Sequence, residues 1–227
     1  MIDVVLLDVD DTLLDFTLGE RVALRAAFEA AHLPFDPMYA SLYHEVNASW
    51  WHRFDLGEVT INQVVIERFV ELFRRIAMPM PLNFAKLYED NLRNQHAYIR
   101  GAKGFLQRMR RDYRLYAVSN GRSDAQRKRL ADSGLDKLTR GVFISQEMGT
   151  HKPDKAYFDM VAAAIEGYDP RTTVIVGDSL SSDVTGGHNA GLRTVWFNRA
   201  HRPLEGHVVP DYEADDFHQI EQDIRGL

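Results

Sequence analysis

Short apolar runs alternate with helical patterns over much of this 227-residue chain. The first run, residues 4–7, is β-branched and aliphatic, which is typical of a strand buried on both faces of a parallel sheet. Four similar runs follow later: RLYAVSN (114–120), GVFIS (141–145), TTVIVGD (172–178) and RTVWFN (193–198). Helical patterns separate them, at 102–112, 122–133, 154–166 and 181–190. This alternation predicts an α/β fold with a mostly parallel sheet.

Residues 17–95 have a different pattern, in which four helical stretches follow one another without a strand. The stretches are 17–32, 38–54, 61–77 and 83–92, and turn-forming segments such as PFDP and MPMP separate them. An all-helical block between the first strand and the remaining strands predicts an inserted domain. We therefore expect a core of residues 1–16 and 96–227 and a helical domain of residues 17–95. The tail beyond residue 200 is expected to add one short strand and a final helix.

The composition argues against several classes of function. A formal net charge of −6 is unsuited to a broad electrostatic grip on nucleic acid, and the basic runs at 108–114 and 127–129 are expected to be solvated helix faces. No apolar stretch approaches the roughly 18 residues of a membrane span, and acidic residues interrupt the start of the chain where a signal peptide is apolar. The chain has no cysteine, so thiolate metal sites and cysteine nucleophiles are excluded. We expect a cytoplasmic protein that binds neither nucleic acid nor a membrane.

Polar residues of particular kinds follow several apolar runs, at the points where strands should end. Because the carboxyl ends of parallel strands meet at one edge of a sheet, we expect these side chains to come together. They are Asp8, Asp10 and Thr12 in the first loop, Ser119, Asn120 and Gly121 in the second, Lys152 before a helix, and Asp178 and Asp183 in GDSLSSD. Carboxylates gathered in this way repel one another unless something compensates their charge.

Phosphoryl transfer is the chemistry that needs such a set. A carboxylate nucleophile splits one difficult displacement into two easier steps through an acyl-phosphate. Mg²⁺ prefers oxygen ligands and is commonly bound through one or two carboxylates, so aspartates at different strand ends could hold it. A lysine and a serine hydroxyl can bind phosphate oxygens, and a second carboxylate can protonate the leaving oxygen. A metal and a phosphate would therefore compensate the carboxylates.

The stretches DVDDT, VSN, HKP and GDSLSSD, in this order, resemble the four motifs of the haloacid dehalogenase superfamily. The resemblance covers essentially the whole chain. It implies a Rossmann-like α/β core, with residues 17–95 forming an inserted four-helix cap of the C1 type. It also implies that Asp8 is the nucleophile and Asp10 the general acid/base of a magnesium-dependent phosphatase that forms an aspartyl-phosphate.

The same resemblance assigns the remaining motif residues to the phosphate or to the metal. Thr12 would brace the first loop, Ser119 with Asn120 and Gly121 would bind the phosphate, and Lys152 would neutralise its charge. The metal would be held by the Asp8 side chain, the backbone carbonyl of Asp10, Asp178, and Asp183 directly or through water. Asp11 stands where the commonest form of the first motif has glycine.

Three further stretches resemble the pyrimidine and non-canonical nucleoside 5′-monophosphatases of this superfamily. They are VNASWWHRFDLGEVT, SNGRSDAQRKRLADSGL and GGHNAGLRTVWFNRAHR. The resemblance implies a small phosphorylated metabolite, a nucleoside monophosphate, as the substrate. A cap that recognises a base needs aromatic and amide side chains, and the candidates are Tyr43, Asn47, Trp50 and Trp51, with His44 and Phe54 beside them. Packing inside a small helical domain is the alternative role for these residues.

Other functions stay open on the sequence alone. A phosphatase for phosphoglycolate or a sugar phosphate would share the core chemistry and differ in the cap. A binding protein for phosphorylated metabolites would keep the fold without turnover, although all four motifs are intact. A signalling receiver domain is disfavoured by motif order and length. A true haloacid dehalogenase would not require Asp10 or magnesium, and a phosphonate hydrolase would need a Schiff-base lysine from an insert whose one lysine is Lys86.

Overall fold

The computed structural model describes residues 1–204 and 208–227 and divides the chain into two compact units. The core unit comprises Met1–Asp15 and Tyr98–Leu227, and the helical unit comprises Phe16–Ala97. None of the helices in the described part of the chain combines the length and the apolar content that crossing a bilayer requires.

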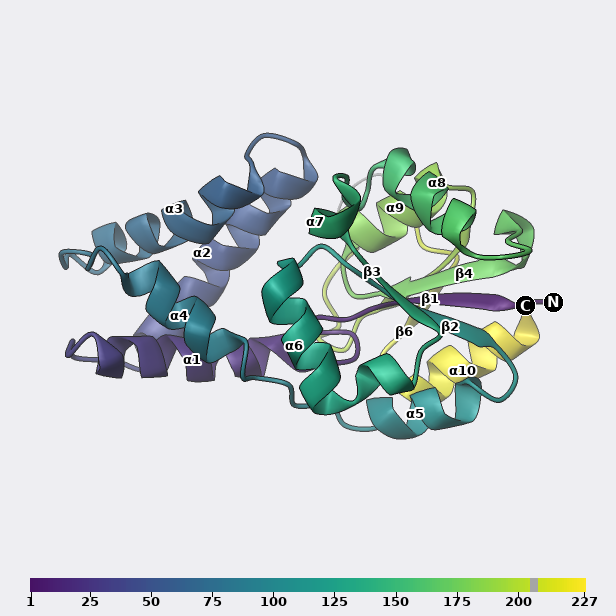
Figure 1. Cartoon of the computed structure of the whole chain (residues 1–227), viewed down its shortest axis with the longest axis horizontal. Helices are drawn as coiled ribbons and strands as arrows, with labels where there is room; N and C mark the ends of the chain where they lie inside the picture. The colour runs from purple at the N-terminus through teal and green to yellow at the C-terminus, as the bar shows by residue number, and fades with distance from the viewer. Residues whose placement is uncertain (205–207) are drawn as a thin grey trace. The chain divides into compact units, whose positions relative to one another are not determined.

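Six strands of the described residues form one sheet in the core unit, in the order β3-β2-β1-β4-β5-β6 (Figure 1). The strands are β1 (Val4–Asp8), β2 (Arg114–Ser119), β3 (Gly141–Ile144), β4 (Thr173–Gly177), β5 (Arg193–Phe197) and β6 (Tyr212–Ala214). Every pairing is parallel, so the predicted α/β class is confirmed. In the register, Asp8 lies opposite Val118 and Leu7 opposite Val176. The carboxyl ends of the three central strands therefore lie at the same edge.

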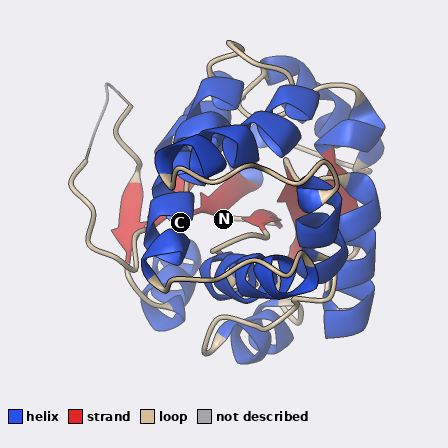
Figure 2. Ribbon diagram, turned by 90° about the vertical axis from the view of Figure 1, so that its left-hand side faces the viewer, coloured by secondary structure: helices blue, strands red, loops and turns tan. Residues whose placement is uncertain are grey.

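Helices cover both faces of this sheet (Figures 1 and 2). Val5 and Leu7 pack in one apolar cluster with α5 and α10, whereas Val4 and Leu6 pack in another with α8, which explains why the first run is apolar at every position. The core-unit helices are α5 (Ala102–Met109), α6 (Ser123–Ser133), α7 (Ser145–Met148), α8 (Lys155–Ala164), α9 (Thr185–Asn189) and α10 (Phe217–Gly226), with 3₁₀ turns η1 (Leu135–Lys137) and η2 (Pro170–Thr172).

The segment after β4 differs from the prediction of one helix over 181–190. It forms a π-helical turn, η3 (Leu180–Val184), followed by the short helix α9. Two side chains bond to the backbone here: the Ser179 hydroxyl accepts from the Ser182 N–H at 3.1 Å, and the Asp183 carboxylate accepts from the Ser179 N–H at 3.1 Å. Such bonds compete with a regular α-helical ladder. The predicted tail strand and final helix correspond to β6 and α10, and residues 205–207 of that stretch lie outside the described residues.

The helical unit contains the four helices that the sequence predicts. They are α1 (Phe16–Ala30), α2 (Met38–Asp55), α3 (Ile61–Arg75) and α4 (Phe84–Leu92). Thr60 and Gln63 form a capping box that fixes the start of α3, because each side chain accepts a hydrogen bond from the other's backbone N–H. The core of this unit is aromatic, with buried Phe28, Tyr43, Phe69, Phe73, Phe84 and Tyr88.

Candidate active site

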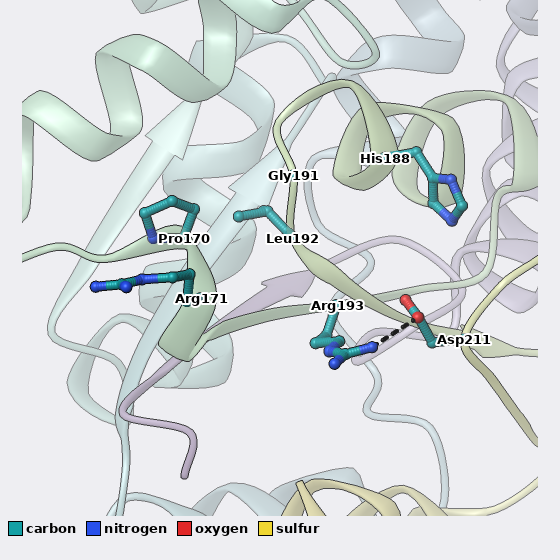
Figure 3. A pocket seen from close by; sticks show the side chains of 7 residues that line it. All are labelled: Pro170, Arg171, His188, Gly191, Leu192, Arg193 and Asp211. Atoms are coloured by element: carbon teal, nitrogen blue, oxygen red, sulfur yellow. Dashed lines mark hydrogen bonds and ion pairs between the residues drawn. The ribbon is translucent and has the colours of Figure 1, made fainter.

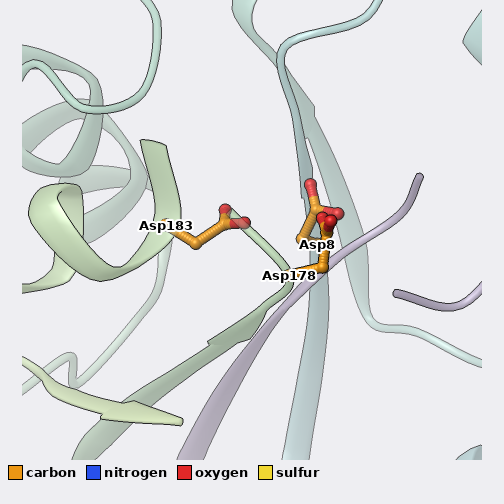
Figure 4. Close-up of side chains that lie close together, drawn as sticks. All are labelled: Asp8, Asp178 and Asp183. Carbon is orange, nitrogen blue, oxygen red and sulfur yellow. The ribbon is translucent and has the colours of Figure 1, made fainter. Parts of the chain in front are cut away.

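Three of the predicted aspartates come together at the carboxyl edge of the sheet (Figure 4). Asp8 ends β1, Asp178 follows β4, and Asp183 reaches back from η3. One carboxylate oxygen from each lies within 4.8 Å of the other two. Gly177 makes this approach possible, because a Cβ atom there would lie 2.1 Å from an oxygen of Asp183. The strand-end carboxylates therefore form one cluster, as their positions in the sequence predict.

Lys152 is the cation at the centre of this cluster. It is 1% exposed, and its Nζ donates to Asp8 Oδ1 at 2.6 Å and to Asp183 Oδ1 at 2.7 Å. Asn120 holds the lysine backbone from both sides: its Oδ1 accepts from the Lys152 N–H at 2.9 Å, and its Nδ2 donates to the Lys152 carbonyl at 2.8 Å. In this structure the Asn120 amide thus positions the lysine, a role that the sequence did not indicate.

Burial and the mutual repulsion of the carboxylates shift the pKa values in this cluster, which has too few cations to compensate its negative charge. Burial raises the pKa of Asp8 to about 7; Asp183 adds to the rise and Lys152 opposes it. Burial, with the charge of Asp8 next, also raises the pKa of Asp178 well above its usual range. Burial alone would lower the pKa of Lys152, but Asp183 and Asp8 hold it above its ordinary value, so the ammonium stays charged.

The donor set fits a divalent cation that prefers oxygen. Three carboxylates face one another against one buried ammonium, and each is close enough to the others to share an ion. Such an ion is the simplest way to offset the burial and the mutual repulsion that raise the pKa values of Asp8 and Asp178. Mg²⁺ is bound in this manner through one or two carboxylates, together with waters and substrate oxygens.

Asp10 lies in the same loop but has different partners. Its Oδ2 accepts from Gln126 Nε2 at 2.7 Å and its Oδ1 from Arg129 Nη1 at 2.6 Å. Gln126 Nε2 also donates to the Ser119 hydroxyl at 2.6 Å. Both α6 side chains are buried, so the expectation that residues 127–129 form a solvated face is wrong for Arg129. Sequence reasoning missed this pair, although their three-residue spacing places them on one helix face.

Two other residues of the first loop have features that the sequence did not reveal. Asp11 has a φ of 56°, a left-handed conformation that aspartate tolerates better than most residues. This explains why glycine commonly stands at that position. Thr12 is fully buried, and its hydroxyl has no hydrogen-bond partner among the described residues, so the bracing role inferred for it stays a prediction.

Strand β5 and the loop after it contact Asp178 from a side that sequence reasoning did not consider. The Asp178 carbonyl accepts from Trp196 Nε1 at 2.9 Å and from Arg202 Nη2 at 2.5 Å. Arg202 also lies 3.4 Å from the Asp178 carboxylate. These contacts fix the peptide that follows β4 and place a second, half-exposed cation beside the cluster.

The candidate base-binding residues of the helical unit all have partners within that unit. Tyr43 is fully buried and stacks on Phe69, with ring centroids 5.2 Å apart. Asn47 is buried and donates to Glu20 Oε2 at 2.6 Å. Trp50 donates to Glu71 Oε2 at 2.9 Å, and Trp51 packs edge-on against Phe54. Substrate contact by these side chains stays a prediction.

A pocket of about 400 Å³ in the core unit lies away from the carboxylates (Figure 3). Its lining residues include Arg171 just before β4, Arg193 at the start of β5, and Asp211, which pairs with Arg193 at 3.2 Å. These positions are at the amino ends of the strands, opposite the edge where Asp8 and Asp178 lie. The pocket therefore does not belong to the candidate site.

The chain matches the sequence model of a known family over residues 2–191, described as haloacid dehalogenase-like hydrolase. The chain belongs to this hydrolase family. The resemblance inferred from the four motifs is thereby confirmed. The match spans the whole strand-end cluster, from Asp8 to Asp183.

Curated relatives match over nearly their whole length. HAD-hydrolase YfnB of Bacillus subtilis (strain 168) is 36% identical over 216 residues, covering 95% of this chain and 92% of that protein. Pyrimidine 5′-nucleotidase PynA of Streptococcus pneumoniae (strain ATCC BAA-255 / R6) is 34% identical over 217 residues, with the same coverage of 95% and 92%. Pyrimidine 5′-nucleotidase YjjG of Escherichia coli (strain K12) is 30% identical over 221 residues, covering 97% and 96%.

One solved structure of YfnB was determined with magnesium bound. It matches this chain with a TM-score of 0.93 at 34% identity and covers 98% of both chains. That structure is described as revealing interdomain movement in YfnB. The fold of the present chain is therefore the fold of a hydrolase that binds magnesium.

Proposed function

We propose that the protein is a magnesium-dependent phosphatase that hydrolyses nucleoside 5′-monophosphates, with pyrimidine nucleotides preferred. The observation that carries the proposal is the cluster of Asp8, Asp178 and Asp183, in which Asp8 and Asp183 contact one buried ammonium, Lys152. Full-length similarity to two proteins named pyrimidine 5′-nucleotidase supports the substrate class.

Asp8, Asp178 and Asp183, with the backbone carbonyl of Asp10, are the proposed metal ligands. A divalent cation bound there supplies positive charge that lets an anionic carboxylate approach an anionic phosphate. Lys152 is proposed to bind a phosphate oxygen with Nζ, which already faces Asp8. The Ser119 hydroxyl is proposed to donate to another phosphate oxygen.

The proposed reaction has two displacements on phosphorus. An Asp8 oxygen bonds to phosphorus while the bond to the nucleoside 5′-oxygen breaks, and Asp10 gives its proton to that leaving oxygen. Asp10, now a carboxylate, takes a proton from water as the water oxygen attacks the aspartyl-phosphate. Phosphate leaves, Asp8 is restored, and Asp10 is protonated again, so the cycle is balanced.

The helical unit, residues 16–97, is proposed to be the cap that recognises the nucleotide base. Its composition supports this assignment, because it carries two adjacent tryptophans, Trp50 and Trp51, that lie outside its fully buried aromatic core. Aromatic side chains bind bases by stacking, which is worth about 1–3 kcal/mol per base. Closing such a cap over the substrate would exclude water and orient the phosphate.

Phosphate release from a substrate panel tests the proposal. The panel contains UMP, dUMP, dTMP, IMP, phosphoglycolate and several sugar phosphates, each assayed with Mg²⁺ and with EDTA. Release that requires Mg²⁺ and favours the pyrimidine monophosphates is the expected result. Preference for phosphoglycolate or a sugar phosphate would keep the chemistry and overturn the substrate. No release from any compound would overturn the enzymatic function and favour a binding role.

A further inference from the structure

Two buried side chains of α6, Gln126 and Arg129, hold groups that the proposed reaction uses; we call this pair the α6 clamp. Gln126 is 1% exposed and Arg129 is 2% exposed. Between them they donate to both carboxylate oxygens of Asp10, at 2.7 and 2.6 Å, and Gln126 also donates to the Ser119 hydroxyl at 2.6 Å. The two groups that the clamp joins lie at the ends of different strands: Asp10 is in the loop after β1, and Ser119 is the last residue of β2. The clamp therefore ties the proposed general acid to the proposed phosphate-binding hydroxyl.

Arg129 fixes which way the Gln126 amide faces. Arginine has donors and no acceptor, so the amide atom that lies 2.7 Å from Arg129 Nη1 must be the carbonyl oxygen Oε1. The NH₂ group then faces Asp10 and Ser119, and it has two hydrogens for these two acceptors. The orientation of this amide follows from its partners alone, and each of its two donors has one acceptor.

This amide in turn fixes the direction of the Ser119 hydroxyl. A hydroxyl can accept two hydrogen bonds and donate one. The Ser119 oxygen accepts from Gln126 Nε2 at 2.6 Å and from the Gly121 N–H at 3.0 Å, so both acceptor positions are filled. What remains is its hydrogen, which must point away from both donors. A group that has to donate to a phosphate oxygen needs that polarity.

Gly121 leaves the room in which the clamp fits. A Cβ atom at this position would lie 2.7 Å from Cγ and 2.9 Å from Nε2 of Gln126. Any larger residue at position 121 would displace the glutamine side chain. The glycine of the VSNG stretch thus has a second consequence beyond its backbone N–H, since it admits the side chain that contacts Asp10 and Ser119.

We propose that Gln126 and Arg129 are positioning residues: they hold the Asp10 carboxyl where it can protonate the leaving oxygen, and they turn the Ser119 hydrogen towards the phosphate. This inference rests on the proposed phosphatase function. It assigns no contact with substrate to either α6 side chain. The effect of the clamp is exerted through Asp10 and Ser119.

The dependence of the rate on the leaving group tests this assignment. The ratio kcat/KM reports the steps up to departure of the leaving group, and only a poor leaving group such as an alkoxide needs the Asp10 proton. p-Nitrophenolate is stable enough to leave without one. The variant Gln126→Met has a side chain of similar length and no donor. We expect it to lower kcat/KM for the preferred nucleotide about 100-fold, within the 10²–10⁴-fold range of general acid catalysis, and for p-nitrophenyl phosphate less than about tenfold.

Three further variants keep the experiment decisive. Gln126→Glu keeps the shape of the side chain but cannot donate from its ionised carboxylate. Like Gln126→Met, it should lower kcat/KM more for the nucleotide than for p-nitrophenyl phosphate. Arg129→Lys, which retains a cationic donor, should recover at least about tenfold of the nucleotide activity that Arg129→Met loses. Arg127→Met on the same helix, whose half-exposed side chain pairs with Glu147, is the matched control and should leave both substrates unchanged.

The outcomes separate this inference from the function on which it rests. A wild-type enzyme that hydrolyses no phosphate ester overturns both. If the wild type is active and folded α6 variants lose equal activity towards both substrates, the positioning of Asp10 is overturned, because that half of the inference depends on the leaving group. If the variants lose activity towards neither substrate, the whole clamp is overturned. Circular dichroism and thermal melting establish that each variant is folded. If Arg129→Met does not fold, the Gln126 variants decide the question, because they remove no buried charge.

Discussion

The two units each bury a charged cluster, and the two clusters differ in how completely their charges are compensated. In the core unit, Asp8, Asp178 and Asp183 cluster at the edge of a parallel sheet, and two of them, Asp8 and Asp183, contact one buried ammonium. In the helical unit, Arg68 lies between Glu89 and the Asn47 amide, and Asn47 in turn donates to Glu20. Both clusters are built from buried side chains and short contacts. They differ in how much negative charge remains without a cation partner.

The charged groups of the helical cluster all have partners inside that unit, although the buried Nε of Arg68 has no hydrogen-bond partner among the described residues. Arg68 donates from Nη1 to Asn47 Oδ1 at 2.9 Å and from Nη2 to Glu89 Oε1 at 2.5 Å, while Glu20 accepts from Asn47 and contacts His44 Nδ1 at 2.9 Å. Rings also lie against the guanidinium, with its carbon 4.9 Å from the Phe69 centroid. Such a network ties α1, α2, α3 and α4 together without needing a ligand.

The core cluster has more negative than positive charge, and this excess is the feature that indicates function. The pKa values of Asp8 and Asp178 are raised because their charges meet burial and one another rather than enough cations. The fold gains no stability from carboxylates held in this way, and the metal and anionic substrate proposed above would account for their position at the strand-end edge. The two clusters show that incomplete charge compensation, rather than burial, distinguishes a functional site from a structural network.

The largest expected effect is the loss of turnover in Asp8→Asn. Removing the proposed nucleophile should lower Mg²⁺-dependent phosphate release by at least about 10³-fold, because Asp8 is the one carboxylate of β1 that contacts Lys152 among the described residues. Circular dichroism should show that the variant is folded. Asp3→Asn, which alters a pair with Arg114 at the opposite, amino end of β1, is the control and should keep full activity. Activity near wild type in Asp8→Asn would refute the nucleophile.

Removing the cation of the helical cluster should give the largest loss of stability. Arg68→Met leaves the Glu20–Asn47 and Glu89 groups without their buried cation, and breaking a buried pair in this way costs about 3–5 kcal/mol in the free energy of unfolding. Arg25→Met, which removes an exposed pair with Glu29 on α1, should cost less than about 1 kcal/mol. Denaturant unfolding measures both. Equal losses in the two variants would contradict a structural role for the helical cluster.

The same contrast explains how much could be predicted from sequence. The strands and the four motif regions were predictable because both are visible in the sequence itself. Each strand is a short apolar run that ends in polar residues, and the motifs follow one another in a recognisable order. The family assignment followed from those motifs and is confirmed. The four helices of residues 17–95 were also predictable, since their apolar positions recur at helical spacing and the turns between them are marked by proline and glycine.

The contacts that complete the site could not be predicted in this way. Arg129 stands in the basic run RKR, and nothing in that run distinguishes it from the exposed Arg127 and the partly exposed Lys128. Its burial depends on Asp10, more than 100 residues away in sequence. The π-helical turn at 180–184 likewise arises from side chain to backbone bonds of Ser179 and Asp183 rather than from a periodic pattern.

The pH dependence of stability should show the uncompensated charge directly. Asp8 has a pKa of about 7 in the folded protein against 3.8 ordinarily. Between these values the unfolded chain binds fewer protons at this residue than the folded protein, so its contribution to the free energy of unfolding falls as pH rises. Asp8→Asn removes this titration. In EDTA, the melting temperature of the variant minus that of wild type should therefore increase by a few °C from pH 4 to pH 7.

Two further observations bear on this pH experiment. Mg²⁺ should raise the wild-type melting temperature more at pH 8 than at pH 5, because ionised carboxylates bind the metal and protonated ones do not. It should raise that of Asp8→Asn less. If the melting temperature of Asp8→Asn fell relative to that of wild type as pH rose, the core cluster would be compensated and the contrast with the helical unit would fail.

The smallest expected effect concerns the aromatic residues beside the helical network. Trp51 packs in a small cluster with Phe54, separate from the fully buried core of the helical unit. If this unit recognises the base, Trp51→Leu should raise KM for UMP about fivefold, equivalent to ~1 kcal/mol of lost stacking, and leave KM for p-nitrophenyl phosphate unchanged. Trp51→Phe keeps an aromatic face and should keep the wild-type KM for both. Equal changes for the two substrates would assign Trp51 to packing alone, and the function of the helical unit would then have to be sought outside this cluster.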